Sequence, residues 1–141
     1  MNVIVDTSVW SLALRRSKVP SGTAVLELAE LIREGRVVML GLVRQELLSG
    51  IKDAKQFQSL RDHLLGFVDL PTETADHEEA AALFNRCRAK GIQGSTIDFL
   101  ICAVAVRRKL PILTTDGDFS RYARLIPIKL HLARLGPRQS G

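Results

Sequence analysis

The chain has 141 residues, of which 46% are hydrophobic and 25% are charged. These are ordinary values for a soluble globular protein, and the length fits one domain that can bury a core without disulfides or a structural metal. The formal net charge of +5 favours an anionic partner, nucleic acid first, although a solubilising surface explains such a charge equally well.

Neither a secretory signal nor a membrane span is predicted. The amino terminus has no basic segment followed by a long apolar one, and the longest apolar run, residues 37–43, is too short to cross a bilayer. The two cysteines, Cys87 and Cys102, stand in helix-like apolar patterns without metal-ligand spacing, which is typical of core thiols. We therefore expect a cytoplasmic protein in a reducing compartment.

In the first half of the chain, short apolar strands are predicted to alternate with amphipathic helices. The predicted strands are residues 3–5 and 37–40, and the predicted helices are residues 8–15, 23–34, a short segment carrying Val43, Glu46, Leu47 and Gly50, and 53–65. A basic loop with turn residues, positions 15–22, joins the first two helices.

The second half continues the alternation. The predicted strands are residues 67–70, 111–114 and 126–128, and the predicted helices are residues 74–90 and 97–109. Such an order favours an α/β fold with a mainly parallel sheet. We expect one domain over residues 1–141, without an internal repeat or linker, in which residues 135–141 form a flexible tail.

Four acidic residues stand just after, or inside, apolar segments: Asp6, Glu46, Asp98 and Asp116. Asp6 and Asp116 follow predicted strands, and the carboxyl ends of parallel strands are where sites form in such sheets. Asp98 stands in the first turn of a helix that is apolar nearly all round, which indicates a buried helix. A carboxylate in such surroundings is unfavourable unless something pairs it.

Each acid also has an ordinary structural explanation. Asp6 can cap a helix, Asp98 can complement the positive end of the helix dipole, and Asp116 with Gly117 forms a good turn pair. Glu46 can be a solvated helical residue. Taken together, however, four clustered carboxylates would repel one another, and Mg²⁺ or Mn²⁺ with its oxygen ligands would remove that conflict. Such an ion can also activate water and orient a phosphodiester.

The ordered motifs resemble those of PIN-domain ribonucleases, and most closely the VapC-type toxins of bacterial toxin–antitoxin modules. The resemblance covers residues 3–128, and its closing motif is the most specific. The motifs are Val5-Asp6-Thr7-Ser8-Val9-Trp10, Val43-Arg44-Gln45-Glu46-Leu47-Leu48-Ser49-Gly50, Asp98-Phe99-Leu100-Ile101-Cys102-Ala103-Val104-Ala105 and Leu113-Thr114-Thr115-Asp116-Gly117-Asp118-Phe119. The resemblance implies a three-layer α/β/α PIN-like fold.

The resemblance also implies a role for each acid. Asp6 and Asp98 are expected to be the main metal ligands, and Asp116 a further ligand, direct or through water. Glu46 is expected to orient or deprotonate the attacking water. Asp118 either supports the ligands or holds the turn, and we favour the turn. The hydroxyls expected to bond the carboxylates or a phosphate are those of Thr7, Ser8 and Thr115, although helix capping explains Ser8 equally well.

The implied activity is metal-assisted hydrolysis of RNA, with tRNA or rRNA as expected substrates. The implied partners are a second copy of the chain, in a homodimer, and a VapB-type antitoxin whose carboxyl-terminal segment places a basic side chain among the acids. Candidates for phosphate contacts are Arg15, Arg16, Lys18, Arg44, Arg121 and Arg124.

Other notable side chains are interpreted structurally. The cations at 107–109 suit the negative end of a helix dipole. Trp10 is expected in the core or at a dimer contact, and His63, His77 and His131 are scattered and expected on the surface.

Three rival functions can be compared with the sequence. A haloacid-dehalogenase-type phosphatase needs a second acid where Ser8 stands and has no use for Glu46. A receiver domain needs an acidic pair after its first strand and a lysine after its last, and this sequence has neither. A catalytically silent PIN-like module that binds RNA or a partner is the third, and the presence of all four acids gives no reason to prefer it.

Overall fold

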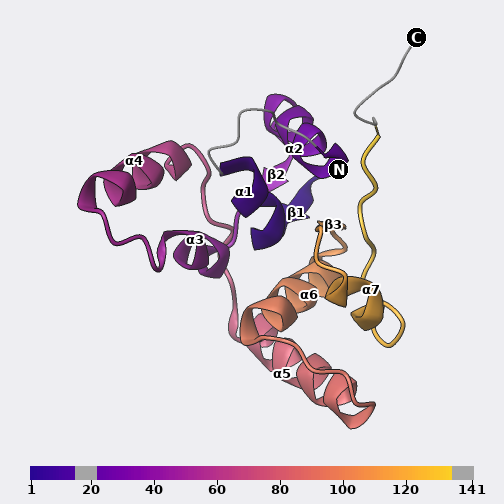
Figure 1. Cartoon of the computed structure of the whole chain (residues 1–141). Coiled ribbons are helices and arrows are strands. Elements are labelled where there is room, and N and C mark those ends of the chain that lie inside the picture. The colour runs from indigo at the N-terminus through magenta and orange to yellow at the C-terminus, as the bar shows by residue number, and fades with distance from the viewer. Residues whose placement is uncertain (15–21, 135–141) are drawn as a thin grey trace.

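Figure 1 shows the computed structural model, which describes residues 1–14 and 22–134. In these ranges the chain forms three strands and seven helices. The elements are β1 (Val3–Val5), α1 (Thr7–Leu14), α2 (Thr23–Arg33), β2 (Val37–Val38), α3 (Gly41–Leu48), α4 (Ala54–Leu64), α5 (Thr74–Ala89), α6 (Thr96–Arg108), β3 (Ile112–Leu113) and α7 (Asp118–Tyr122). The predicted phosphate contacts Arg15, Arg16 and Lys18, and the predicted tail at 135–141, lie outside the described residues.

The strands form a parallel sheet in the order β2-β1-β3. Ile4 of β1 pairs with Val38 on one side and with Ile112 on the other. Single parallel bridges extend the sheet at both edges, from Met39 to Asp69 and from Ile112 to Leu130. The predicted α/β fold with a mainly parallel sheet is therefore confirmed.

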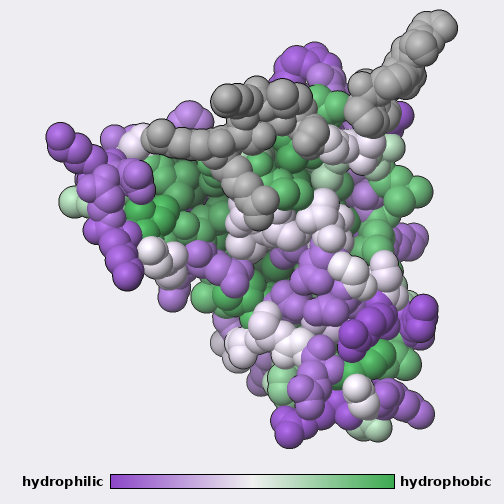
Figure 2. All heavy atoms as spheres, viewed as in Figure 1, coloured by the Kyte–Doolittle hydropathy of each residue, from purple (hydrophilic) through white to green (hydrophobic). Residues whose placement is uncertain are grey.

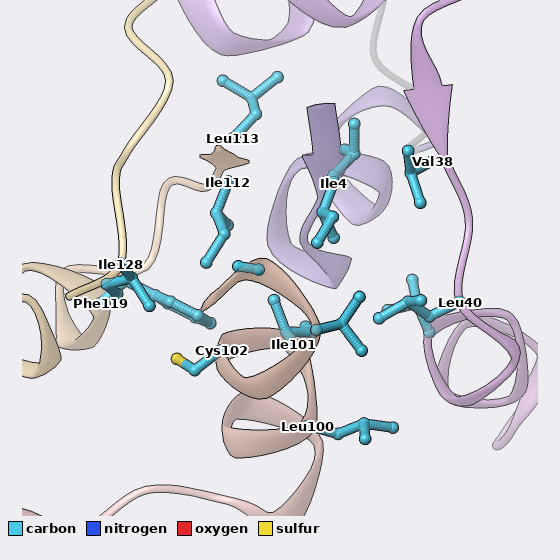
Figure 3. Close-up of a cluster of buried hydrophobic side chains, with 14 of the residues drawn as sticks. Ile4, Val38, Leu40, Leu100, Ile101, Cys102, Ile112, Leu113, Phe119 and Ile128 are labelled. Atoms are coloured by element: carbon cyan, nitrogen blue, oxygen red, sulfur yellow. The ribbon is translucent and has the colours of Figure 1, made fainter. Parts of the chain in front are cut away.

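The core lies on both faces of this sheet. β1 is fully buried, as a short β-branched strand in the middle of a parallel sheet should be. In Figure 3 Ile112 points toward α6, whereas its neighbour Leu113 points to the opposite side. Figure 1 shows α5 and α6 on one side of the sheet and α1 and α2 on the other. These helices form the outer layers of a three-layer arrangement.

Helix α6 is the central helix of the fold. Seven consecutive residues from Phe99 to Ala105 are buried, which confirms the sequence-based expectation of a helix surrounded by apolar contacts. Both cysteines, Cys87 in α5 and Cys102 in α6, are buried free thiols, as predicted. α6 therefore carries Asp98, at its exposed start, on a firmly packed element.

The carboxyl-terminal segment is held by polar contacts as well as by the sheet. Lys129 and His131 exchange backbone hydrogen bonds with Ile112 at 2.9 and 2.7 Å. The buried side chain of Glu27 in α2 accepts from Arg134 at 2.9 Å and lies 2.7 Å from His131. His131 is thus half-buried beside the buried Glu27, rather than the simple surface residue that was expected.

Two predictions about the end of the chain were also wrong in detail. The last sheet contact is at Leu130 rather than in residues 126–128, because the segment pairs with Ile112 only after Pro127. The short helix α7 was not predicted, since the Asp-Gly-Asp-Phe sequence indicates a turn as readily as a helical start.

None of the helices in the described parts of the chain combines the length and the apolar character that crossing a membrane requires.

Candidate metal centre

The carboxyl ends of β1 and β3 bring two of the predicted acids to one edge of the sheet. The Asp6 N–H donates to the carbonyl of Leu113 at 2.9 Å, so the residue that follows β1 lies beside the end of β3. Asp116 follows β3 by three residues. Adjacent parallel strands therefore supply Asp6 and Asp116, as the sequence predicted.

The Asp6 carboxylate is buried, with 4% of the residue exposed. Its Oδ2 accepts from the Ser8 hydroxyl at 2.7 Å and from the Thr114 hydroxyl at 2.8 Å. The predicted role of Ser8 is confirmed. Thr115 takes part only through its backbone N–H, which donates to Ser8 Oγ at 3.1 Å.

Thr114 is a contact that the sequence analysis missed. Its hydroxyl also accepts from the Asp116 N–H at 2.9 Å, so one side chain joins two of the acids. Its position two residues before Asp116 mirrors that of Ser8 two residues after Asp6, which was the available signal. The third predicted hydroxyl, that of Thr7, is buried and has no hydrogen-bond partner among the described residues.

Asp98 stands in the first turn of α6, where Ser95 caps the helix by accepting from the Asp98 N–H at 3.0 Å. The Asp98 Oδ2 accepts from the hydroxyl of Tyr122 at 2.7 Å. Burial raises the pKa of Asp98, hydrogen bonds from the side chains of Tyr122 and Ser95 oppose that effect, and the charges of Asp6 and Asp116 raise the pKa further. The net pKa of Asp98 lies above its ordinary value, which shows that the site disfavours the bare charge.

Asp98, Asp116 and Asp118 each offer a carboxylate oxygen, and the three oxygens lie within 4.8 Å of one another. The Asp118 N–H donates to Asp116 Oδ1 at 2.9 Å, which fixes the turn as predicted. The carboxylate of Asp118, however, stands inside the cluster rather than outside it. Asp6 is not one of this group of three and is joined to it through Thr114 and through its charge.

Glu46 lies apart from these contacts. It is exposed on α3, between the buried residues Val43 and Leu47. Within residues 1–14 and 22–134, the group of acids whose carboxylate oxygens lie within 4.8 Å of one another does not include Glu46. Its role toward the attacking water remains a prediction.

The described residues balance the charge of only one acid in the cluster. Arg121 pairs with Asp118 at 3.4 Å, but across the described ranges no lysine or arginine forms an ion pair with Asp6, Asp98 or Asp116. The other two buried acids differ, because Arg134 pairs with Glu27 and both Arg107 and Arg108 pair with Asp76. The cluster therefore has an all-oxygen donor set and a charge that suits a hard divalent cation.

Arg44, a predicted phosphate contact, and the arginines at the end of α6 have structural partners. The Arg44 guanidinium donates to Asp69 at 3.0 Å and to the carbonyls of Leu64 and Phe67, so it fastens the segment after α4. Arg107 and Arg108 bind Asp76 and are more than complements of a helix dipole. Trp10 is a core residue, as predicted, and meets the Phe67 ring edge-to-face with centroids 5.1 Å apart.

Comparison with known proteins shows which family the chain resembles. The chain matches the PIN domain family over residues 3–125. It is 30% identical to the VapC ribonuclease Mb1587 of Mycobacterium bovis and to ribonuclease VapC11 of Mycobacterium tuberculosis, over 127 residues that cover 87% of this chain and 92% of each relative.

Solved structures share the fold at lower identity. FitAcB from Neisseria gonorrhoeae is 22% identical with a TM-score of 0.72, covering 92% of this chain and 96% of that one. VapBC2 from Rickettsia felis, bound to a DNA fragment from its promoter, is 18% identical with a TM-score of 0.72, covering 93% of this chain and 98% of that one. These similarities confirm the predicted PIN-like α/β/α fold.

Proposed function

Because the chain belongs to the PIN-domain family, among the VapC ribonucleases, we propose that it is a metal-dependent endoribonuclease and the toxin of a type II toxin–antitoxin pair. The observation that carries the proposal is the group of converging carboxylates at the carboxyl edge of the sheet, in which, among the described residues, only Asp118 pairs with an arginine. We further propose that residues 1–141 form one domain and that the protein acts in the cytoplasm.

In this proposal Asp6, Asp98 and Asp116 hold Mg²⁺ or Mn²⁺, with Asp118 in support. When bound, the ion supplies a polarised phosphodiester and a water of lowered pKa. Ser8 and Thr114 hold Asp6, and Tyr122 holds Asp98. Glu46, which is exposed on α3, orients or deprotonates the attacking water.

The proposed substrate is RNA, and tRNA and rRNA are the first candidates. The net charge of +5 favours a polyanion even though the site itself is acidic. Arg121 in α7 and Arg124 just after it are exposed, and among the residues that the structure describes they are the candidate phosphate contacts closest in sequence to Asp116.

The proposed protein partners are a VapB-type antitoxin and a second copy of the chain. A hollow of about 950 Å³ lies between α1, α3 and α4 and includes the apolar side chains of Leu14, Leu47, Ile51 and Leu60. Figure 2 shows apolar side chains gathered on this face of the molecule. An apolar hollow with a polar surround suits a partner protein better than RNA, and it supports the antitoxin proposal.

The direct test uses protein purified free of any antitoxin. With Mg²⁺ or Mn²⁺ it should cleave cellular RNA, and chelation should stop the reaction. Asp6→Asn and Asp98→Asn should each reduce cleavage by at least about 100-fold, because each removes a charged group proposed to bind the ion. Asp53→Asn is the matched control, since it makes the same chemical change at an exposed helix cap on α4.

The alternative is a catalytically silent PIN-like module that binds RNA or a partner. It would be supported if the wild-type protein bound RNA but cut none with either metal. Full cleavage by both site variants would instead show that the site is assigned wrongly. Sequencing of RNA ends after induction in cells would identify the substrate and the cleavage position.

A further inference from the structure

Tyr122 is a fully buried residue of α7 that reaches the acidic cluster only through its hydroxyl. The hydroxyl donates to Asp98 Oδ2 at 2.7 Å, and it lowers the pKa of Asp98 more than the hydrogen bond from the Ser95 side chain does. No sequence pattern indicates this contact, because Tyr122 lies outside all four acidic motifs.

The aromatic ring of Tyr122 has little freedom to move. Its centroid lies 4.8 Å from that of Phe99 and 5.2 Å from that of Phe119, the second pair being edge-to-face. On a third side lies Gly94, where an added Cβ would come within 2.1 Å of the Tyr122 hydroxyl oxygen and 2.7 Å of Cζ. The packing therefore fixes the position of the hydroxyl, and through it the orientation of Asp98.

The same arrangement recurs at the other aspartates. Asp6 is held at Oδ2 by two hydroxyls, and Asp116 is held at Oδ1 by a backbone N–H. The Tyr122 hydroxyl and these donors thus each engage a single oxygen of their carboxylate. A neutral donor on one oxygen fixes the orientation of a carboxylate and leaves its full negative charge for a cation at the other.

We propose that Tyr122 is a positioning residue of the metal site, whose hydroxyl fixes Asp98 so that the free carboxylate oxygen faces the ion. The proposal rests on the metal-binding part of the proposed function. In a purely structural role, the hydrogen bond would only satisfy a buried hydroxyl. Removing the hydroxyl would then leave the metal affinity of the folded protein unchanged, whereas a positioning role predicts that the affinity falls.

The test is the affinity for Mn²⁺ alone, measured by calorimetric titration of metal-free wild-type and Tyr122→Phe proteins well below their melting temperatures. The substitution keeps the ring and removes one hydroxyl, and circular dichroism with a urea titration checks that the variant is folded. We expect the Kd for Mn²⁺ to rise about 10-fold. Asp53→Asn, remote in sequence and exposed, should bind Mn²⁺ like the wild type.

Cleavage of RNA provides a second readout. Because the proposed defect lies in metal binding, Tyr122→Phe should cut RNA slowly at limiting Mn²⁺ and recover most of the wild-type kcat at saturating Mn²⁺. A folded Tyr122→Phe protein whose Kd for Mn²⁺ stays within about 2-fold of the wild type would overturn the proposal. So would a loss of kcat that saturating Mn²⁺ does not repair.

These outcomes separate the proposal from the proposed function. If the wild type binds Mn²⁺ but cuts no RNA, the ribonuclease proposal fails and the role of Tyr122 is decided by the Kd values alone. If the wild type binds Mn²⁺ no better than Asp98→Asn, the metal site and the role of Tyr122 are both wrong.

Discussion

At the scale of single residues, the acidic cluster differs from the other buried acids in what holds it. Glu27 and Asp76 are bound by arginines, whereas Asp6 and Asp98 are bound by hydroxyls. Arginine would neutralise the carboxylates, but a hydroxyl only orients them. Buried carboxylates thus have two uses in this fold. Those paired with arginine stabilise it, and those held by hydroxyls keep their charge available for a cation.

The first prediction concerns the stability of Asp98→Asn without metal. The pKa of Asp98 is raised in the folded protein, so this group stabilises the fold below its unfolded pKa of 3.8, and that contribution is lost as the pH rises through the folded value. At pH 7 the bare charge is therefore unfavourable. Removing it should increase the free energy of unfolding by on the order of 1 kcal/mol.

Urea unfolding of both proteins in a chelating buffer measures this difference. Saturating Mn²⁺ should then reverse the order, because ligand at 100 times its Kd stabilises the folded wild type by about 2.7 kcal/mol. A variant that is less stable than the wild type in the chelating buffer would contradict the prediction.

The second prediction concerns Gly94. An alanine Cβ at this position would lie 2.8 Å from a Phe99 ring carbon and closer still to Tyr122, and neither ring can yield without disturbing the core. Gly94→Ala should therefore lower the free energy of unfolding by about 1–3 kcal/mol. Gly66→Ala is the control, since a Cβ there meets nothing within 4 Å. Equal urea midpoints for the two variants would show that the Tyr122 ring is not tightly confined.

The residues that could be predicted at this scale are those with a local signal. Asp6 and Asp116 end apolar strands, and Asp98 interrupts an apolar helix. Tyr122 and Gly94 carry no such signal, because their meeting depends on how α7 packs against the turn before α6. Glu46 is the opposite case, a residue with a local signal but, in the described part of the chain, without an observed contact to the cluster. Its apolar neighbours are buried, while its own side chain is exposed.

At the scale of elements, the regular parts of the fold followed from periodicity. The predicted strands and helices match β1, β2, β3 and α1 to α6 to within a few residues. The hydrophobic pattern is a weaker guide where a segment joins the sheet through a single β-bridge. Phe67–Leu70 was predicted as a strand but contributes only the bridge of Asp69 with Met39, and Leu130 joins the sheet where 126–128 was expected.

The pairing of α5 with α6 is another feature that periodicity does not show. The Asp76 side chain in α5 is fully buried and accepts from Arg108 of α6 at 2.8 Å, and Arg107 also donates to it. Burial raises the pKa of Asp76, but the Glu73 backbone N–H and the two arginines outweigh it, and the pKa lies below its ordinary value. The sequence does not reveal this pairing, because Asp76 looks like a helix-capping acid and the two arginines lie some 30 positions away.

The third prediction follows from this contact. Asp76→Asn leaves two guanidinium groups without their anion, and it should lower the free energy of unfolding at pH 7 by about 3–5 kcal/mol. Glu73→Gln is the control, because Glu73 is exposed and its pair with Arg107 should contribute only about 0–1 kcal/mol. Thermal and urea unfolding of the two variants measure the contrast. Similar stabilities would mean that Asp76 acts only as a helix cap.

At the scale of the whole molecule, the carboxyl-terminal segment links the outer helix α2 to the sheet edge that carries the site. Leu130 pairs with Ile112, and Arg134 binds both Glu27 and Glu34. Hydrogen bonds from Arg134 and Arg36 lower the pKa of Glu34 to about 2. Strand β3, which leads to Asp116, is therefore supported from both of its edges.

The fourth prediction is that this support depends on pH through Glu27. Burial raises the pKa of Glu27, but hydrogen bonds from His131 and Arg134 outweigh burial, and the pKa falls below its ordinary value of 4.5. A carboxyl with a lowered folded pKa stabilises the protein above its unfolded pKa, and that contribution is lost as the pH falls through the folded value. Stability should thus be steady above about pH 5.5 and decline below pH 4.5.

Glu27→Gln isolates the contribution of this carboxyl from those of the other acids. At pH 7 the variant should be less stable than the wild type by about 1–3 kcal/mol, because a buried charged hydrogen bond is lost. The difference should shrink toward pH 3, where Glu27 of the wild type also becomes protonated. Urea titrations of both proteins at pH 7, 5, 4 and 3 measure it. A difference that stays constant over this range would show that the charge of Glu27 does not hold the segment.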